Sequence, residues 1–128
     1  MAGTAGVGNL KCLYINLDSG LGDKTIKVSD INGADFGIQV VALVVDVLTG
    51  SGSGTTAYQK NDSSAPITAG ATASTNSAGI LNVGLNSAVA NRQLDPTDNL
   101  VISRATAASA QMIELFYTEK SPRSVTLT

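Results

Sequence analysis

Alternating hydrophobic and polar positions recur along most of this chain and predict β-strands. Residues 10–17 (LKCLYINL) place Leu13, Ile15 and Leu17 on one face, because successive side chains of a strand point to opposite sides. In the stretch from Gly79 the same spacing groups Leu81, Val83 and Leu85. Similar patterns predict strands at residues 25–29, 55–60 and 79–87.

Residues 37–48 (GIQVVALVVDVL) are β-branched at positions of both faces, which is typical of a strand covered on both sides. A buried helix is the alternative. The high valine content and the bracketing Gly37 and Gly50 favour the strand. Asp46 is the single charge in this run, and we expect it at a sheet edge or paired with a lysine or arginine.

The most regular pattern lies in residues 94–120 (LDPTDNLVISRATAASAQMIELFYTEK). A turn containing Pro96 and three side chains that bond nearby backbone precedes a strand at residues 100–104. A link of small residues then leads to a strand at residues 111–119, in which Ile113, Leu115 and Tyr117 share a face. We interpret the two strands as a hairpin.

Three stretches lack such a pattern. Residues 1–9 contain three glycines and predict a flexible N-terminal arm. Residues 50–54 predict a surface loop, and residues 61–78 predict a long loop with at most one weak edge strand near residues 66–71. Unpatterned loops of this length are often contact surfaces.

About eight strands, spaced by 8–15 residues, predict an all-β fold: an antiparallel β-sandwich, jelly-roll-like, with a flexible N-terminal arm. The length of 128 residues fits one domain. We therefore expect the arm at residues 1–9, the sandwich at residues 10–120 and a C-terminal tail at residues 121–128.

Composition narrows the function. Only 14% of the residues are charged and the net charge is −2, which argues against nucleic acid and anionic membranes as partners. The chain has no Trp and few Tyr, so sugars and single-stranded nucleic acids lack stacking platforms. The longest apolar run is too short to span a bilayer. A surface with few charges suits a protein that packs against other protein.

The candidate chemistry is sparse. Without histidine, neither a Ser-His-Asp nor a Cys-His arrangement is possible, and no carboxylate pair stands in an apolar setting. Cys12 is the only cysteine, which excludes an intrachain disulfide, and we expect an inert thiol. Asp18 and Asp23 match no calcium loop. We predict no enzyme activity, no cofactor and no metal. No export signal is visible, so we expect synthesis in a cytoplasm.

The run at residues 94–120 resembles the closing strands of small jelly-roll proteins among the head genes of tailed bacteriophages. In those proteins a turn, an xLxIxR strand, a small-residue link and an alternating strand ending in YTE recur near the C-terminus. The small, histidine-free chain also resembles capsid decoration (cement) proteins. The resemblance implies a homotrimer on the exterior of the capsid in the virion, made in the host cytoplasm. It would bridge copies of the major capsid protein and stabilise the lattice.

The same resemblance directs the choice of contact residues. We expect capsid contacts from the arm and loops, at Thr4, Val7, Asn9, Ser51, Ser53, Ser64 and Ile67. We expect oligomer contacts at the aromatic residues Tyr14, Phe36, Tyr58, Phe116 and Tyr117, each of which is alternatively an ordinary core residue.

Two other functions stay open. One is the trimeric head domain of a tail fibre or receptor-binding protein, which would normally carry a long trimerising shaft. The other is a small β-sandwich adaptor without catalytic activity, which would normally show an export signal.

Overall fold

Each sheet of this protein is built from strands that lie far apart in the sequence. A computed structural model describes residues 10–20, 22–31, 34–49, 54–104 and 109–120. The first sheet contains, in order, β1 (Leu10–Leu17), β9 (Gln111–Glu119), β3 (Ile38–Val47) and β6 (Gly79–Val83), and β7 (Gln93–Leu94) pairs with β3. The second sheet contains, in order, β2 (Gly22–Lys27), β8 (Asn99–Arg104), β4 (Thr55–Lys60) and β5 (Ala73–Ser74). A 3-10 turn (Val28–Asp30) and a short helix, α1 (Val89–Arg92), complete the described elements.

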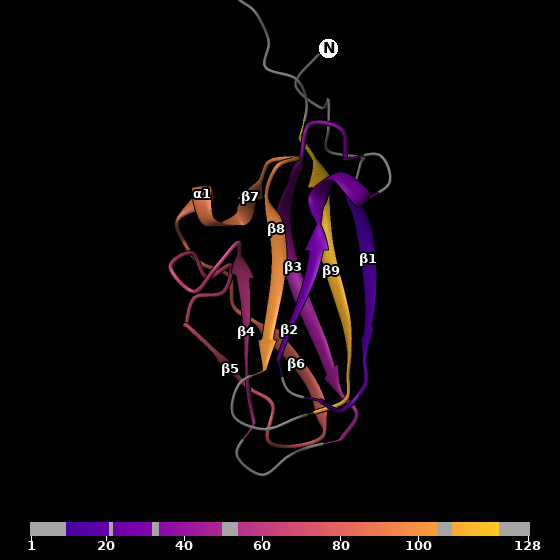
Figure 1. The fold of residues 1–128 in the computed structure, drawn as a ribbon. Helices are drawn as coiled ribbons and strands as arrows, with labels where there is room; N and C mark the ends of the chain where they lie inside the picture. Colours follow the sequence, from indigo (N-terminus) through magenta and orange to yellow (C-terminus); the bar gives the residue numbers. More distant parts are fainter. Residues whose placement is uncertain (1–9, 21, 32–33, 50–53, 105–108, 121–128) are drawn as a thin grey trace, which may run out of the picture.

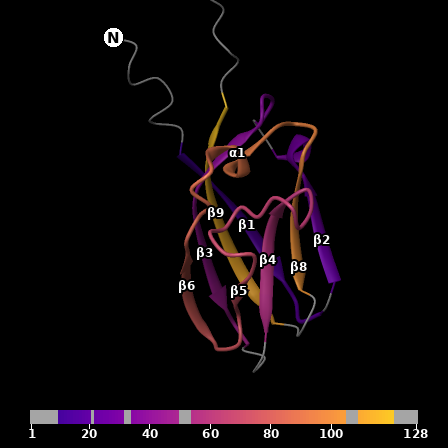
Figure 2. The ribbon, with the colours of Figure 1, turned by 90° about the vertical axis from the view of Figure 1, so that its left-hand side faces the viewer.

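The strand pairs are nested in the order of a jelly roll. With the two-residue β7 set aside, the first strand pairs with the last (β1 with β9), and β2 with β8, β3 with β6 and β4 with β5 follow inward. A long antiparallel hairpin wrapped into two facing sheets has this arrangement. Figures 1 and 2 show the two sheets from perpendicular directions. The prediction of an all-β, antiparallel, jelly-roll-like sandwich of about eight strands is confirmed.

The expected hairpin at residues 94–120 is wrong. β8 pairs with β2 and β4 in the second sheet, whereas β9 pairs with β1 and β3 in the first. The chain therefore crosses between the sheets after β8. The alternation within each strand is as expected: Leu100 and Ile102 face the core from β8, and Ile113 does so from β9. Alternation identifies the buried face of a strand, but it carries no information about which strand lies beside it.

A bulge in β3 explains its nearly continuous apolar sequence. The pairing with β9 shifts between Val40 and Ala42, so Val41 is an extra residue and is exposed. The buried positions are even-numbered before the bulge (Ile38, Val40) and odd-numbered after it, at residues 43, 45 and 47. The prediction of a strand covered on both sides is therefore wrong. One face of β3 is buried, and the bulge changes which positions form it.

The core fills the space between the sheets. Its larger members come from the inward faces of the strands: Ile15, Leu17, Ile38, Val40, Leu43, Val45, Val47, Tyr58, Leu100, Ile102, Ile113, Leu115 and Tyr117. Residues 61–78 contribute Ile67, which is fully buried. Its backbone N–H donates to Tyr58 O (2.9 Å) and its carbonyl accepts from Asn86 N (2.8 Å). The predicted weak edge strand is reduced here to isolated bridges at Pro66 and Thr68.

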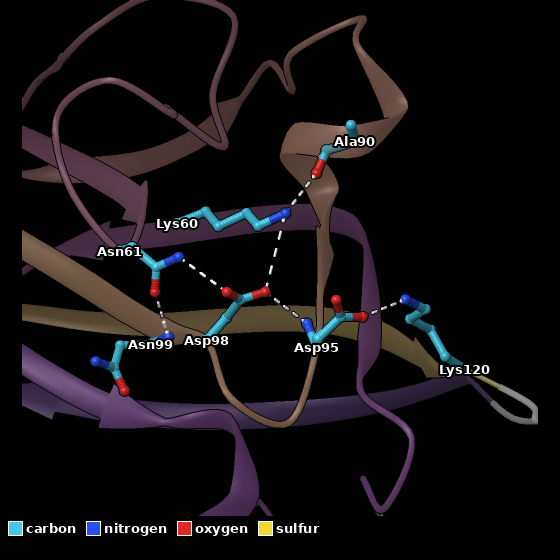
Figure 3. Close-up of polar contacts among 7 residues, drawn as sticks. All are labelled: Lys60, Asn61, Ala90, Asp95, Asp98, Asn99 and Lys120. Carbon is cyan, nitrogen blue, oxygen red and sulfur yellow. Dashed lines mark hydrogen bonds and ion pairs between the residues drawn. The ribbon is translucent and has the colours of Figure 1, made fainter.

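A polar network fixes the turn before β8 at the end of the sandwich where β4 and β9 finish (Figure 3). Asp98 accepts from Asn61 Nδ2 (2.9 Å) and from Asp95 N (2.7 Å), and its Oδ2 lies 3.9 Å from Lys60 Nζ. Lys120 Nζ donates to Asp95 Oδ1 (2.6 Å). Burial opposes ionisation of Asp98, but these hydrogen bonds and the two lysines outweigh it and lower the pKa of the carboxyl group.

Candidate interaction surface

The outward face of the first sheet carries large apolar side chains that remain exposed. Paired residues form rows across the strands in the order β1, β9, β3 and β6. The first row is Asn16, Met112, Asp46 and Ile80, and the second is Tyr14, Glu114, Val44 and Asn82. The third row covers only β1, β9 and β3, with Cys12, Phe116 and Ala42. Ile80 is 71% exposed, Tyr14 66% and Met112 39%. Leu10, on the same face at the start of β1, is 58% exposed. We call these three rows together with Leu10 the outer face.

The strand sequences determine this face through their alternation. In β1, Ile15 and Leu17 point into the core, so Cys12 and Tyr14 point outward. In β9 the residue pair Met112 and Phe116 is outward for the same reason. Both faces of these strands are therefore apolar, although only one belongs to the core. Several large exposed apolar side chains on one face of a sheet are a common mark of a protein interaction site.

The outer face also carries two carboxylate side chains, those of Glu114 and Asp46. Glu114 lies between Tyr14 and Val44, and Asp46 lies between Met112 and Ile80. β3 has β9 on one side and β6 on the other, so Asp46 is not at a sheet edge. Among the described residues, no lysine or arginine forms an ion pair with Asp46. The expectation of an edge position for Asp46 is therefore wrong, and the alternative of a pair with a lysine or arginine finds no partner within the described ranges.

Cys12 is the one candidate nucleophile on this face, and its environment disfavours the reactive form. Burial raises the pKa of the thiol and the nearby Glu114 carboxylate raises it further, whereas a hydrogen bond with Tyr14 acts in the opposite direction. The thiol is therefore protonated at neutral pH. The outer face is suited to packing against protein rather than to covalent chemistry.

The structure divides the five predicted oligomer residues. Tyr14 and Phe116 share the outer face, where Phe116 is half-buried. Phe36 is 53% exposed and lies in the turn before β3, outside the three strand rows of the outer face. Tyr58 and Tyr117 are 2% and 4% exposed and belong to the core. A surface role for these last two residues is wrong, because both occupy inward positions of their strands.

The predicted capsid contacts are largely outside the described residues. Thr4, Val7, Asn9, Ser51 and Ser53 lie there. Ser64 is exposed and donates through its backbone N–H to Asp62 Oδ1 (2.9 Å). Ile67 has 0% exposure, so its predicted surface role is wrong. The composition of its loop indicated a surface segment, but the one large residue in that loop is packed into the core.

Sequence reasoning missed Leu10, Ile80 and Met112 as candidate contact residues. Their signal was present in the strands, because each occupies a position out of phase with the core residues of its strand. Selection by aromatic type ignores whether a position is in phase with the core residues of its strand. Phase separates Tyr14 and Phe116 from the core residue Tyr117.

No known protein family, curated protein or solved structure matches this chain. Within the described ranges, no group of three or more Cys, Asp or Glu side chains is placed to hold a metal ion. Among the helices in those ranges, none is long and apolar enough to cross a membrane. The feature from which a function is best argued is the outer face.

Proposed function

We propose that this protein is a structural, non-catalytic component of a phage virion. It forms a homotrimer, binds the exterior of an assembled head and stabilises the capsid lattice by bridging major capsid subunits. The observation that carries the proposal is the exposed apolar outer face of a sheet whose other side already forms the core. The sequence resemblance of residues 94–120 to small jelly-roll head proteins supports the phage origin.

The composition of the outer face favours contact with protein. Tyr14, Phe116 and Met112 are residue types enriched at interface cores, where charged residues are depleted. In the proposal, a second copy of the chain covers this face and removes Tyr14 and Ile80 from water. Each large apolar side chain buried in this way contributes about 1.5–3 kcal/mol to association.

Binding to the lattice follows the same physical logic. A protein that binds assembled capsid but not free subunits stabilises the assembled state by linkage. Three copies held in one trimer combine individually weak contacts through avidity. The proposed capsid contacts therefore need little area per subunit.

The first test is the mass of the protein in solution by light scattering or native mass spectrometry. We expect three copies of the 13.0 kDa chain, about 39 kDa. Tyr14→Glu and Ile80→Glu place a charge on the outer face and should give folded monomers. Thr72→Glu adds the same charge at an exposed loop position before β5 and should leave the trimer intact. A monomeric wild type would contradict the proposed trimer. Trimers that still form with both outer-face substitutions would contradict the outer face as the contact between its subunits.

The second test addresses the capsid separately. Tailed-phage heads prepared without this protein are mixed with it and sedimented, with unassembled major capsid protein as the control. We expect the protein to sediment with heads and not to associate with free subunits. A stable trimer that does not bind assembled heads would overturn the capsid role. It would not contradict the outer face as the contact between subunits of the trimer.

A further inference from the structure

A second feature lies between the two sheets, at the end of the sandwich where β1 finishes and β2 begins. A cavity of about 280 Å³ is lined by the loop of residues 18–20, by the end of β1 and by the side chains of Lys24 and Arg104. The two basic residues come from neighbouring strands of the second sheet. Gly22 pairs with Arg104 and Lys24 pairs with Ile102, so both cations share the inward face with the core residue Ile102.

Arg104 is a buried cation with part of its guanidinium group unused. It is 1% exposed, and its Nη1 donates to Asp18 O (2.6 Å) and Ser109 O (2.8 Å). Its Nε is buried and has no hydrogen-bond partner in the described part of the chain. No carboxylate there forms an ion pair with Arg104 either. A buried charge without a counter-ion is costly, so this site favours an anion.

The unused edge has the geometry for an oxyanion. The Nε–H and the adjacent Nη2–H of a guanidinium group point in parallel, and together they bind two oxygens of one carboxylate or phosphate. Nη2 faces the loop that lines the cavity, since a Cβ at Gly20 would lie 4.0 Å from it. At Gly22, which pairs with Arg104, a Cβ would meet no described atom within 4 Å.

Lys24 supplies a second positive charge. It is exposed, and it forms no ion pair with any acid in the described ranges. Asp18 also lines the cavity and its negative charge opposes an incoming anion. With Arg104 and Lys24 against Asp18, the lining keeps one net positive charge.

We propose that this cavity binds a small oxyanion, a carboxylate or a phosphate group. Arg104 holds two of its oxygens through Nε and Nη2, and Lys24 contributes its ammonium group at the cavity mouth. The volume fits a single such group rather than a nucleotide. Its two basic residues belong to the second sheet, and of the lining residues only Asn16 is part of the outer face, so the site and the proposed assembly can be tested separately.

The test is an NMR titration of the full chain with sodium phosphate and, separately, with sodium acetate and sodium succinate. Sodium chloride keeps the ionic strength constant. We expect saturable shifts of the backbone amides of Ser19, Gly20 and Lys24. Saturation by phosphate alone or by the carboxylates alone identifies which oxyanion the site prefers. The absence of saturable shifts with every salt up to about 100 mM would overturn the proposal, since a Kd beyond that concentration corresponds to almost no binding free energy.

Three exposed residues provide variants that keep the buried Arg104 in place. Lys24→Gln should weaken binding about fivefold or more, and Asp18→Asn should strengthen it by a similar factor. Lys27→Gln removes the same charge from the opposite face of β2 and should leave the affinity unchanged. Equal losses in Lys24→Gln and Lys27→Gln would indicate only bulk electrostatic attraction and would contradict a defined site.

Discussion

The hydroxyl group of Tyr58 in β4 donates a 2.8 Å hydrogen bond to Oε1 of Gln111 in β9, and this contact joins the two sheets inside the core. Gln111 is fully buried and also donates to Thr56 Oγ1 (2.8 Å) and Ser109 Oγ (2.7 Å). Burial raises the pKa of Tyr58, although a hydrogen bond with Thr56 and the charge of Arg104 act against it. The hydroxyl group therefore remains a donor across the physiological pH range.

Tyr58→Phe should destabilise the protein. The substitution removes the donor and leaves Gln111 Oε1 buried without its partner, which should cost about 2 kcal/mol in the free energy of unfolding. Urea denaturation at fixed protein concentration measures the change. With both variants made in the monomeric Ile80→Glu background, Tyr14→Phe removes a hydroxyl group from an exposed ring and should change the free energy by less than about 0.5 kcal/mol. Equal effects of the two substitutions would contradict the assigned role of the contact.

Gly37→Ala should be among the more damaging single-methyl additions. Gly37 has a φ of +96°, and a Cβ there would lie 2.3 Å from the carbonyl oxygen of Leu94. Backbone strain and the collision together should cost about 3 kcal/mol, and the cost should appear as a lower melting temperature.

Gly79→Ala provides the matched control for that experiment. Gly79 also has a positive φ, of +139°, but a Cβ there would have no described neighbour within 4 Å. Only the backbone strain remains, and we expect a loss of about 1 kcal/mol. If Gly37→Ala were no worse than Gly79→Ala, the close approach to Leu94 would not be important for stability.

Two isoleucines distinguish a core residue from a contact residue. Ile67→Ala should lower the free energy of unfolding by about 3 kcal/mol, because it leaves a cavity beside a fully buried position. Ile80→Ala changes a side chain that is 71% exposed and should stay within about 0.5 kcal/mol in the monomeric Tyr14→Glu background. Chemical denaturation of both variants in that background measures the difference. If Ile67→Ala left the free energy of unfolding unchanged, Ile67 would not be a core residue, and the surface role expected from its loop would stand.

Asp98→Asn should remove a pH-dependent contribution to stability. The pKa of Asp98 is lowered in the folded protein, so its contribution is present above the ordinary aspartate pKa, near about 4. It is lost as the pH falls through the lower folded value. At pH 7 the substitution should cost about 2 kcal/mol, since hydrogen bonds to a charged group are lost.

The diagnostic result for Asp98 is the pH profile. The difference between wild type and Asp98→Asn should narrow below about pH 4, as the wild-type carboxyl group takes up its proton. Denaturation curves at a series of pH values measure it. Asp35→Asn removes an equal charge from an exposed turn and should behave like wild type at pH 7. A constant difference for Asp98→Asn across the acidic range would show that its ionised form is not the stabilising species.

The sequence by itself determined the strands and their buried faces. Alternation placed Ile15, Leu17, Ile113 and Leu115 in the core, and it predicted the bounds of β1 and β9, because side-chain direction along a strand is a local property. The jelly-roll architecture followed from the number and spacing of such strands.

Only the tertiary structure decided how the strands pair, where the register of β3 shifts and which loop residue is buried. The crossing between β8 and β9, the bulge at Val41 and the burial of Ile67 depend on contacts between distant segments, which a local pattern does not encode. Residue type does not separate Tyr14 from Tyr117, whereas their phase along the strand does, since Tyr14 lies on the outer face and Tyr117 in the core. The Arg104 cavity arises only where β1, β2 and β8 meet in space.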